Sequence, residues 1–117
     1  MASELFQKRL LFTKLLPKLL AGAEGLGYLV TINEVLRSPA AAQWNAAHGV
    51  GISNSLHLVG LAVDLNLFTQ DGTYITTNLG HDQLGVYWKS LHTDCRWGGD
   101  FIKKDFNHYS LFYQGRA

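Results

Sequence analysis

From residue 55 to residue 67 the chain reads SLHLVGLAVDLNL, and this stretch decides the fold. Its second half predicts a strand, in which Ala62 and Asp64 share a face because strand side chains alternate. His57 lies on the loop that enters this strand, so its side chain and that of Asp64 can converge on one point. We expect Gly60 to relieve crowding where the backbone approaches that point.

The N-terminal segment predicts an amphipathic helix. Ser3 is a typical N-cap residue, and the apolar residues after it recur at helical spacing on one face. Pro17 lacks an amide hydrogen, so we expect it to kink or divide this helix. The glycines at 22, 25 and 27 are expected to end it.

The rest of the chain alternates short extended and helical patterns. The expected strands and extended segments are 28–32, 61–67, 73–76 (paired across a turn at 70–72), 96–97 and 108–113. The expected helices are 39–45 and 83–91, with a loop at 49–54. Together they predict an α+β domain with helices packed on a small, mainly antiparallel sheet.

Composition narrows the class of protein. The 117 residues fit one domain, 1–117, and 47% hydrophobic with 16% charged residues is a globular composition. The net charge of +1 argues against a nucleic-acid binder, and no apolar run is long enough for membrane insertion. The single cysteine, Cys95, excludes an intrachain disulfide and a thiolate zinc cluster. Any metal site must therefore use histidines and carboxylates.

A second polar segment supplies such groups. Trp97-Gly-Gly-Asp100 is followed by Asp105 and His108. A catalytic zinc commonly has three protein ligands and an open fourth position for water. His57, Asp64 and His108 form a suitable set, and Asp105 is then available to accept a proton from that water.

The motif S-x-H-x-x-G-x-A-x-D, followed by W-G-G-D and D-x-x-H-[FY], resembles the M15 family of metallopeptidases. That family contains D-Ala-D-Ala carboxypeptidases, D-Ala-D-Ala dipeptidases and phage endolysins that cleave the L-alanyl-D-glutamate bond. The segment Glu34-Val-Leu-Arg37-Ser38, with Gln43, is similar to the family's arginine-containing segment. The resemblance covers roughly residues 28–110 and implies a Hedgehog/DD-peptidase-like fold.

The resemblance also implies roles for individual residues. His57, Asp64 and His108 are expected to bind Zn²⁺, with Asp105 as general base and later acid. Arg37 is expected to contact the substrate at a carboxylate or at the oxyanion. Ser55 is expected to support the substrate site, and Trp97 to be core, site wall or substrate platform. Many relatives carry Glu where this chain has Asp105, and Ser110 replaces an acidic residue two positions after His108.

The function expected from these features is hydrolysis of a peptidoglycan stem-peptide amide, between L-Ala and D-Glu. Two alternatives stay open at this point: a D-Ala-D-Ala carboxypeptidase or dipeptidase, and a non-catalytic zinc module that recognises wall peptides. Lysines and an arginine interrupt the N-terminal apolar stretch, so no signal peptide is expected. With the compact size, the resemblance implies an endolysin-like bacteriophage enzyme, antimicrobial through cytolysis, and we expect a monomer. It would reach the cell wall from the host cytoplasm, after release through the inner membrane.

Overall fold

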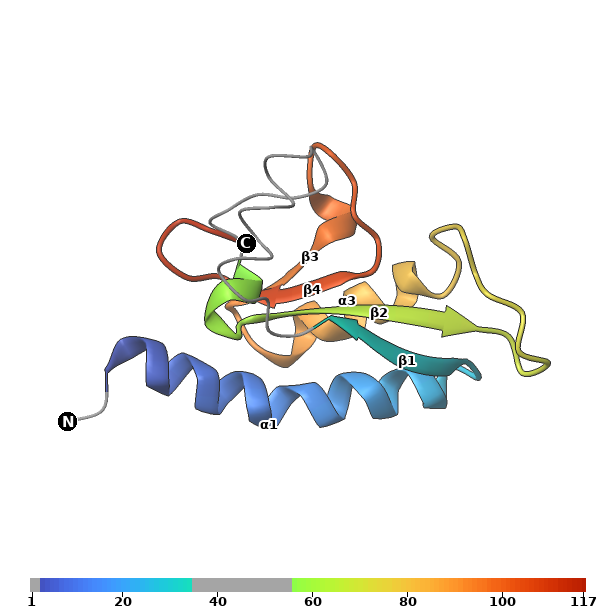
Figure 1. Ribbon diagram of the computed structural model, residues 1–117, viewed down its shortest axis with the longest axis horizontal. Helices are drawn as coiled ribbons and strands as arrows, with labels where there is room; N and C mark the ends of the chain where they lie inside the picture. Colours follow the sequence, from blue (N-terminus) through green and yellow to red (C-terminus); the bar gives the residue numbers. More distant parts are fainter. Residues whose placement is uncertain (1–2, 35–55) are drawn as a thin grey trace.

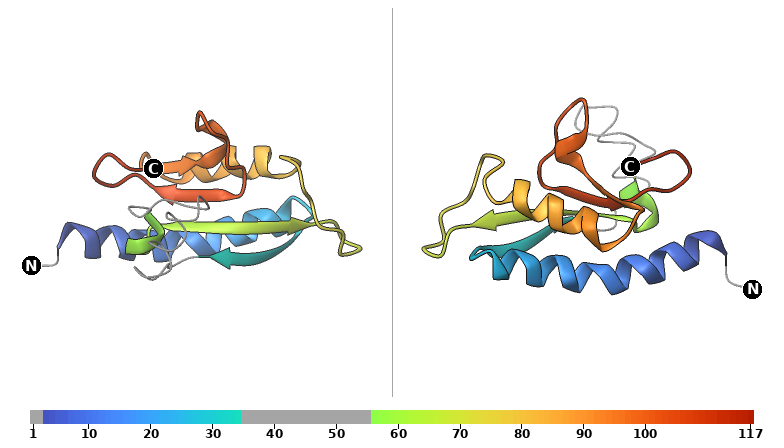
Figure 2. Two further views of the ribbon diagram at one scale, coloured as in Figure 1. Left: turned by 45° about the horizontal axis from the view of Figure 1, so that its top comes forward. Right: turned by 180° about the vertical axis from the view of Figure 1, so that it is seen from behind.

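The computed structural model of the protein describes residues 3–34 and 56–117. In this part of the chain, two helices lie on one side of a four-stranded sheet, as Figures 1 and 2 show. The helices are α1 (Glu4–Gly25) and α3 (His81–Leu91), with short 3-10 turns η1 (Leu56–Val59) and η2 (Gly98–Asp100). The strands are β1 (Leu29–Glu34), β2 (Ala62–Phe68), β3 (Cys95–Trp97) and β4 (His108–Leu111). The expected helix at 39–45 and loop at 49–54 lie outside the described residues.

Helix α1 runs unbroken through Pro17, so the expectation that this proline divides the helix is wrong. Ser3 caps the helix as predicted, its Oγ accepting a hydrogen bond from the Phe6 amide at 3.1 Å. Pro17 removes only one helical hydrogen bond. Tertiary packing holds the helix on both sides of it, through the buried residues Phe12, Leu15, Leu19 and Ala23. Gly27 adopts φ +93° just beyond the end of the helix, as the glycine-rich sequence predicted.

The sheet has the order β1-β2-β4-β3, and its paired strands are all antiparallel. This confirms the predicted α+β class with an antiparallel sheet. The predicted hairpin after β2 is reduced to a bridge between Phe68 and Tyr74, with the Ile75 amide donating to the Leu67 carbonyl at 2.9 Å. Between Ile32 and Glu34 the pairing of β1 with β2 shifts register, which marks a β-bulge.

The two faces of the sheet have different roles. Val63, Leu65 and Leu67 of β2 join Tyr109 and Leu111 of β4 in the hydrophobic core beneath the helices. Because strand side chains alternate, Asp64 and His108 point to the opposite face. The sheet thus separates the core from the polar residues. In the described part of the chain, neither helix has the length and apolar character needed to cross a lipid bilayer.

Candidate metal centre

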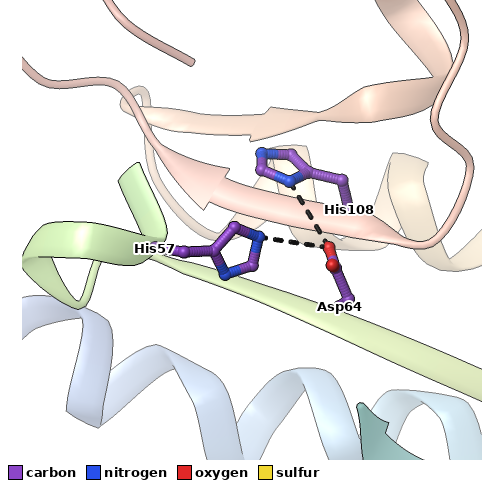
Figure 3. A group of neighbouring side chains, drawn as sticks. All are labelled: His57, Asp64 and His108. Atoms are coloured by element: carbon purple, nitrogen blue, oxygen red, sulfur yellow. Dashed lines mark ion pairs between the residues drawn. The ribbon is translucent and has the colours of Figure 1, made fainter. Parts of the chain in front are cut away.

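Three side chains from separate parts of the chain meet on the face of the sheet opposite the helices. His57 comes from η1, Asp64 from the middle of β2 and His108 from the start of β4. Asp64 and His108 are direct partners in the β2–β4 ladder, so they share a face at the shortest cross-strand spacing. Figure 3 shows both imidazoles pointing at the Asp64 carboxylate. One ligand atom from each residue lies within 4.8 Å of the others.

The distances suit a small metal ion with nitrogen and oxygen ligands. His57 Nε2 lies 3.4 Å and His108 Nδ1 lies 3.5 Å from Asp64 Oδ1. Ligand atoms placed about 2.0–2.2 Å from a tetrahedral zinc are about 3.3–3.6 Å apart. Among the described residues, Asp64 Oδ1 has no hydrogen-bond partner although it is buried. A buried oxygen with no donor is unfavourable, and a cation at this point removes the penalty, so the residues fit the ion.

The charge of Asp64 is stabilised where it stands. Burial by itself would raise the pKa of Asp64, but its contacts with His108 and His57 outweigh that effect and lower the pKa to about 2. The carboxylate is therefore ionised at neutral pH. The imidazoles beside it are buried, with 3% of His57 and 6% of His108 exposed. One ionised carboxylate and two buried imidazoles together form a suitable ligand set for zinc.

The backbone around His57 depends on Gly60, but for another reason than expected. Gly60 has φ +73°, a conformation that favours glycine, and it lets the chain turn from η1 into β2. A Cβ on Gly60 would meet the Arg9 guanidinium of α1, not the metal cluster. The expectation that Gly60 relieves crowding at the site is therefore wrong. It places His57 by setting the turn.

The turn that carries Asp105 and His108 lies directly against Gly98. The Asp105 amide donates to the Gly98 carbonyl at 2.9 Å, and the His108 amide donates to the Asp105 carbonyl at 3.1 Å. A Cβ on Gly98 would lie 2.1 Å from the Asp105 carbonyl oxygen and 2.9 Å from His108 Cβ. Only a residue without a side chain permits this approach. The first glycine of the W-G-G-D segment thus supports the site, a role the sequence reading did not assign.

Asp105 lies at the rim of the cluster. Its Oδ2 is 4.0 Å from His108 Nδ1, and its side chain is 52% exposed, so both the ligands and solvent can reach it. Burial raises the pKa of Asp105, and the charge of Asp64 raises it further, while His108 and His57 offset part of the increase. A carboxylate with a raised pKa beside a metal site is suited to accept and return a proton.

Trp97 is not in the cluster. It is 7% exposed, and it lies opposite Tyr109 on the helix side of the sheet. Cβ atoms on Gly85 and Gly99 would each fall within 2.3 Å of its indole ring, and its Nε1 donates to the Phe106 carbonyl at 2.7 Å. The structure gives Trp97 a packing role between α3 and η2. Its predicted contact with substrate stays a prediction.

Two residues near the cluster had no assigned role in the sequence reading. Glu34 Oε1 lies 3.7 Å from His57 Nδ1, and the Phe101 ring lies 5.4 Å from the His108 ring. Glu34 belongs to the segment that resembles the arginine-containing segment of the family. Its proximity to His57 depends on the bulge in β1, which no sequence pattern indicates. Arg37 and Ser55, both predicted site residues, lie outside the described residues.

Comparison with known structures shows the fold. The chain is similar to the L-Ala D-Glu endopeptidase ChiX of Serratia marcescens, with a TM-score of 0.68 and 24% sequence identity. The match covers 84% of this chain and 80% of that one. No curated protein sequence matches the chain significantly.

Comparison with protein families identifies the relatives of the chain. A family model of M15 peptidases, described as D-alanyl-D-alanine carboxypeptidase, matches residues 48–111. The matched segment contains all three residues of the cluster and Asp105. Because it spans more than half of the sequence, the chain belongs to the M15 peptidase family.

Proposed function

We propose that the protein is a zinc-dependent peptidase that hydrolyses the L-alanyl-D-glutamate bond in the stem peptide of peptidoglycan. The observation that carries the proposal is the buried Asp64 oxygen, which faces two imidazoles and has no hydrogen-bond partner among the described residues, with Asp105 at the rim. Peptide hydrolysis needs an activated water and a group that moves its proton. The cluster and Asp105 supply these two requirements.

His57, Asp64 and His108 would hold the zinc. When bound, the ion supplies Lewis acidity, which polarises a carbonyl and acidifies water. Asp105 accepts the proton of the attacking water and later donates it to the leaving amine. General-base assistance of this kind contributes about 10²–10⁴ in rate. On the family resemblance we assign Arg37 to oxyanion stabilisation or substrate binding, and Ser55 to support of the site.

The bond is inferred from relatives, and they point to two candidates. The similar structure is an L-Ala D-Glu endopeptidase, and its match covers most of both chains. The family model is described as a D-alanyl-D-alanine carboxypeptidase, which supports the second candidate. Both reactions use the same cluster and differ in the groups that border the scissile bond.

Digestion of purified peptidoglycan with the zinc-loaded protein tests the proposal. New N-terminal amines on D-Glu, identified by mass spectrometry, are expected. Release of free D-Ala instead would show the carboxypeptidase reaction. Bound zinc with no new termini would reject catalysis and leave a wall-binding module.

Variants connect any turnover to the cluster. Asp64→Ala is expected to lose both zinc and activity, because it removes the oxygen that both imidazoles face. Asp100→Asn is the matched control, since Asp100 pairs with Lys89 at the surface at 2.7 Å. It should keep both properties. Full activity in Asp64→Ala would exclude the cluster as the catalytic centre.

A further inference from the structure

The bulge in β1 brings a second carboxylate to the site. Ile32 pairs with Leu65, but the next residue of β2, Asp64, pairs with Glu34 and not with Asn33. Directly opposed residues of an antiparallel pair share a face. The extra residue therefore places Glu34 on the same side of the sheet as Asp64. Bulges commonly re-aim side chains next to functional sites.

Two opposed carboxylates normally repel each other and destabilise a sheet. Here the His57 ring lies between them. Its Nε2 is 3.4 Å from Asp64 Oδ1, and its Nδ1 is 3.7 Å from Glu34 Oε1. Each ring nitrogen thus faces its own carboxylate. The ring is 3% exposed, so water has little access to compete for either nitrogen.

A neutral imidazole carries its proton on one nitrogen and a lone pair on the other. A metal takes the lone pair, and the partner of the second nitrogen decides which tautomer is present. His57 Nε2 faces the cluster, so Nδ1 must hold the proton when the ring binds an ion. Among the described residues, the Glu34 carboxylate is an acceptor near Nδ1, at 3.7 Å. The 3.7 Å separation is longer than a hydrogen bond, so a small approach of the two groups would complete the contact.

We propose that Glu34 is a positioning residue that accepts the Nδ1 proton of His57 and thereby fixes the metal-binding tautomer and orientation of this ring. This inference rests on the proposed function, because it assumes that the cluster binds zinc. Partners of this kind typically change metal affinity about 10–100-fold when they are removed. Glu34 acts through His57 and needs no contact with the substrate.

Zinc affinity of the full chain, measured by competition with a chromophoric chelator, tests the proposal. Glu34→Ala is expected to bind zinc about 10–100-fold more weakly than the wild type. Glu34→Gln keeps an oxygen that can accept the Nδ1 proton, so it should bind more tightly than Glu34→Ala. Glu24→Gln is the matched control: it removes one carboxylate from an exposed position on α1 and should leave the affinity unchanged.

Nitrogen-15 NMR of the imidazoles gives a readout that a purely structural role would not change. In the zinc-loaded wild type, His57 should show a protonated Nδ1 and a metal-bound Nε2. A Glu34→Ala affinity within twofold of the wild type would overturn the proposal. So would a Glu34→Gln affinity as weak as that of Glu34→Ala, since a remote charge effect would then explain both.

The wild-type measurement separates this inference from the proposed function. If the wild type binds no zinc, the proposed function itself fails. If the wild type binds zinc and the Glu34 variants bind equally well, only the role of Glu34 fails. Melting curves in chelator check that each variant folds. Should Glu34→Ala not fold, the His57 spectrum of the zinc-loaded wild type decides: a ring that binds zinc through Nδ1 and carries its proton on Nε2 would overturn the proposal.

Discussion

Replacing Gly98 with alanine tests how closely the site depends on the fold around it. The added Cβ would lie 2.1 Å from the Asp105 carbonyl oxygen, whereas real Cβ contacts essentially never fall below 3.0 Å. The shortfall is 3.0 − 2.1 = 0.9 Å, so the turn must move by about 1 Å. Gly98 has no positive φ, so the effect is steric and not conformational.

The displaced turn carries both the proposed proton acceptor, Asp105, and a proposed metal ligand, His108. Asp105 and His108 are linked to Gly98 through the Asp105 amide and the turn that follows it. A misplacement of about 1 Å near a catalytic centre lowers the rate about 100-fold. Overpacking also destabilises the fold by about 1–3 kcal/mol. We therefore expect Gly98→Ala to fold, with weaker zinc binding and kcat/KM about 100-fold lower.

The measurements are kcat/KM on a muropeptide, zinc affinity and urea unfolding. Gly25→Ala is the matched control, because no atom lies within 4 Å of its added Cβ. It should keep full activity and lose no stability, since alanine is favoured over glycine in a helix and Gly25 is only the last residue of α1. Wild-type kcat/KM in a folded Gly98→Ala variant would refute the steric reasoning.

Further expectations concern single groups and the metal. Asp105→Asn should lower kcat by about 10²–10⁴ while its zinc affinity, measured by chelator competition, stays within a few-fold of the wild type; near-normal turnover would assign the base to another residue. Burial lowers the pKa of His81 from 6.5 to about 4. Between pH 6.5 and 4 the folded protein therefore binds fewer protons than the unfolded chain. Its free energy of unfolding should fall by about 3 kcal/mol as the pH falls through this range. His81→Gln can still accept a hydrogen bond from Tyr109, and in urea titrations it should lack this part of the pH dependence. The same pH dependence in His81→Gln and the wild type would contradict this prediction. Burial raises the pKa of Cys95 to about 12, so a disulfide reagent at pH 8 should label the native protein at least about 100-fold more slowly than the unfolded chain; equal rates would place the thiol in solvent. Zinc at 100 times its Kd should stabilise the apoprotein by about 2.7 kcal/mol, which corresponds to a rise of about 10 °C in Tm. A Tm that does not change when zinc is added would argue against the metal site.

The sequence predicted most of the secondary structure because its signals are local. The Ser3 cap, the alternation in β2 and the left-handed Gly27 each depend on a few neighbouring residues. The expected division of the helix at Pro17 was wrong because the effect of one proline in a helix depends on tertiary packing, which local sequence does not show. Helix α3 begins at His81, two residues before the expected start at residue 83. This difference is within the usual uncertainty of helix ends.

The candidate site was predictable in part for the same reason. The motif places His57 and Asp64 close together along the chain, and the structure brings His108 to them across the β2–β4 ladder. The contacts of Glu34 and Gly98 with the site were not predicted, because a bulge and a close backbone approach leave no periodic pattern in the sequence. The ligand roles, the oligomeric state and the place of action stay predictions.

If the cluster binds zinc as proposed, the direct pairing of Asp64 with His108 couples binding of the ion to correct assembly of the sheet. A slip of one residue between β2 and β4 would turn one of the two side chains to the core face and separate the pair. The proposed ion would then bind only to a chain whose strands are already aligned correctly. Zinc binding would thus select correctly folded chains over misaligned ones.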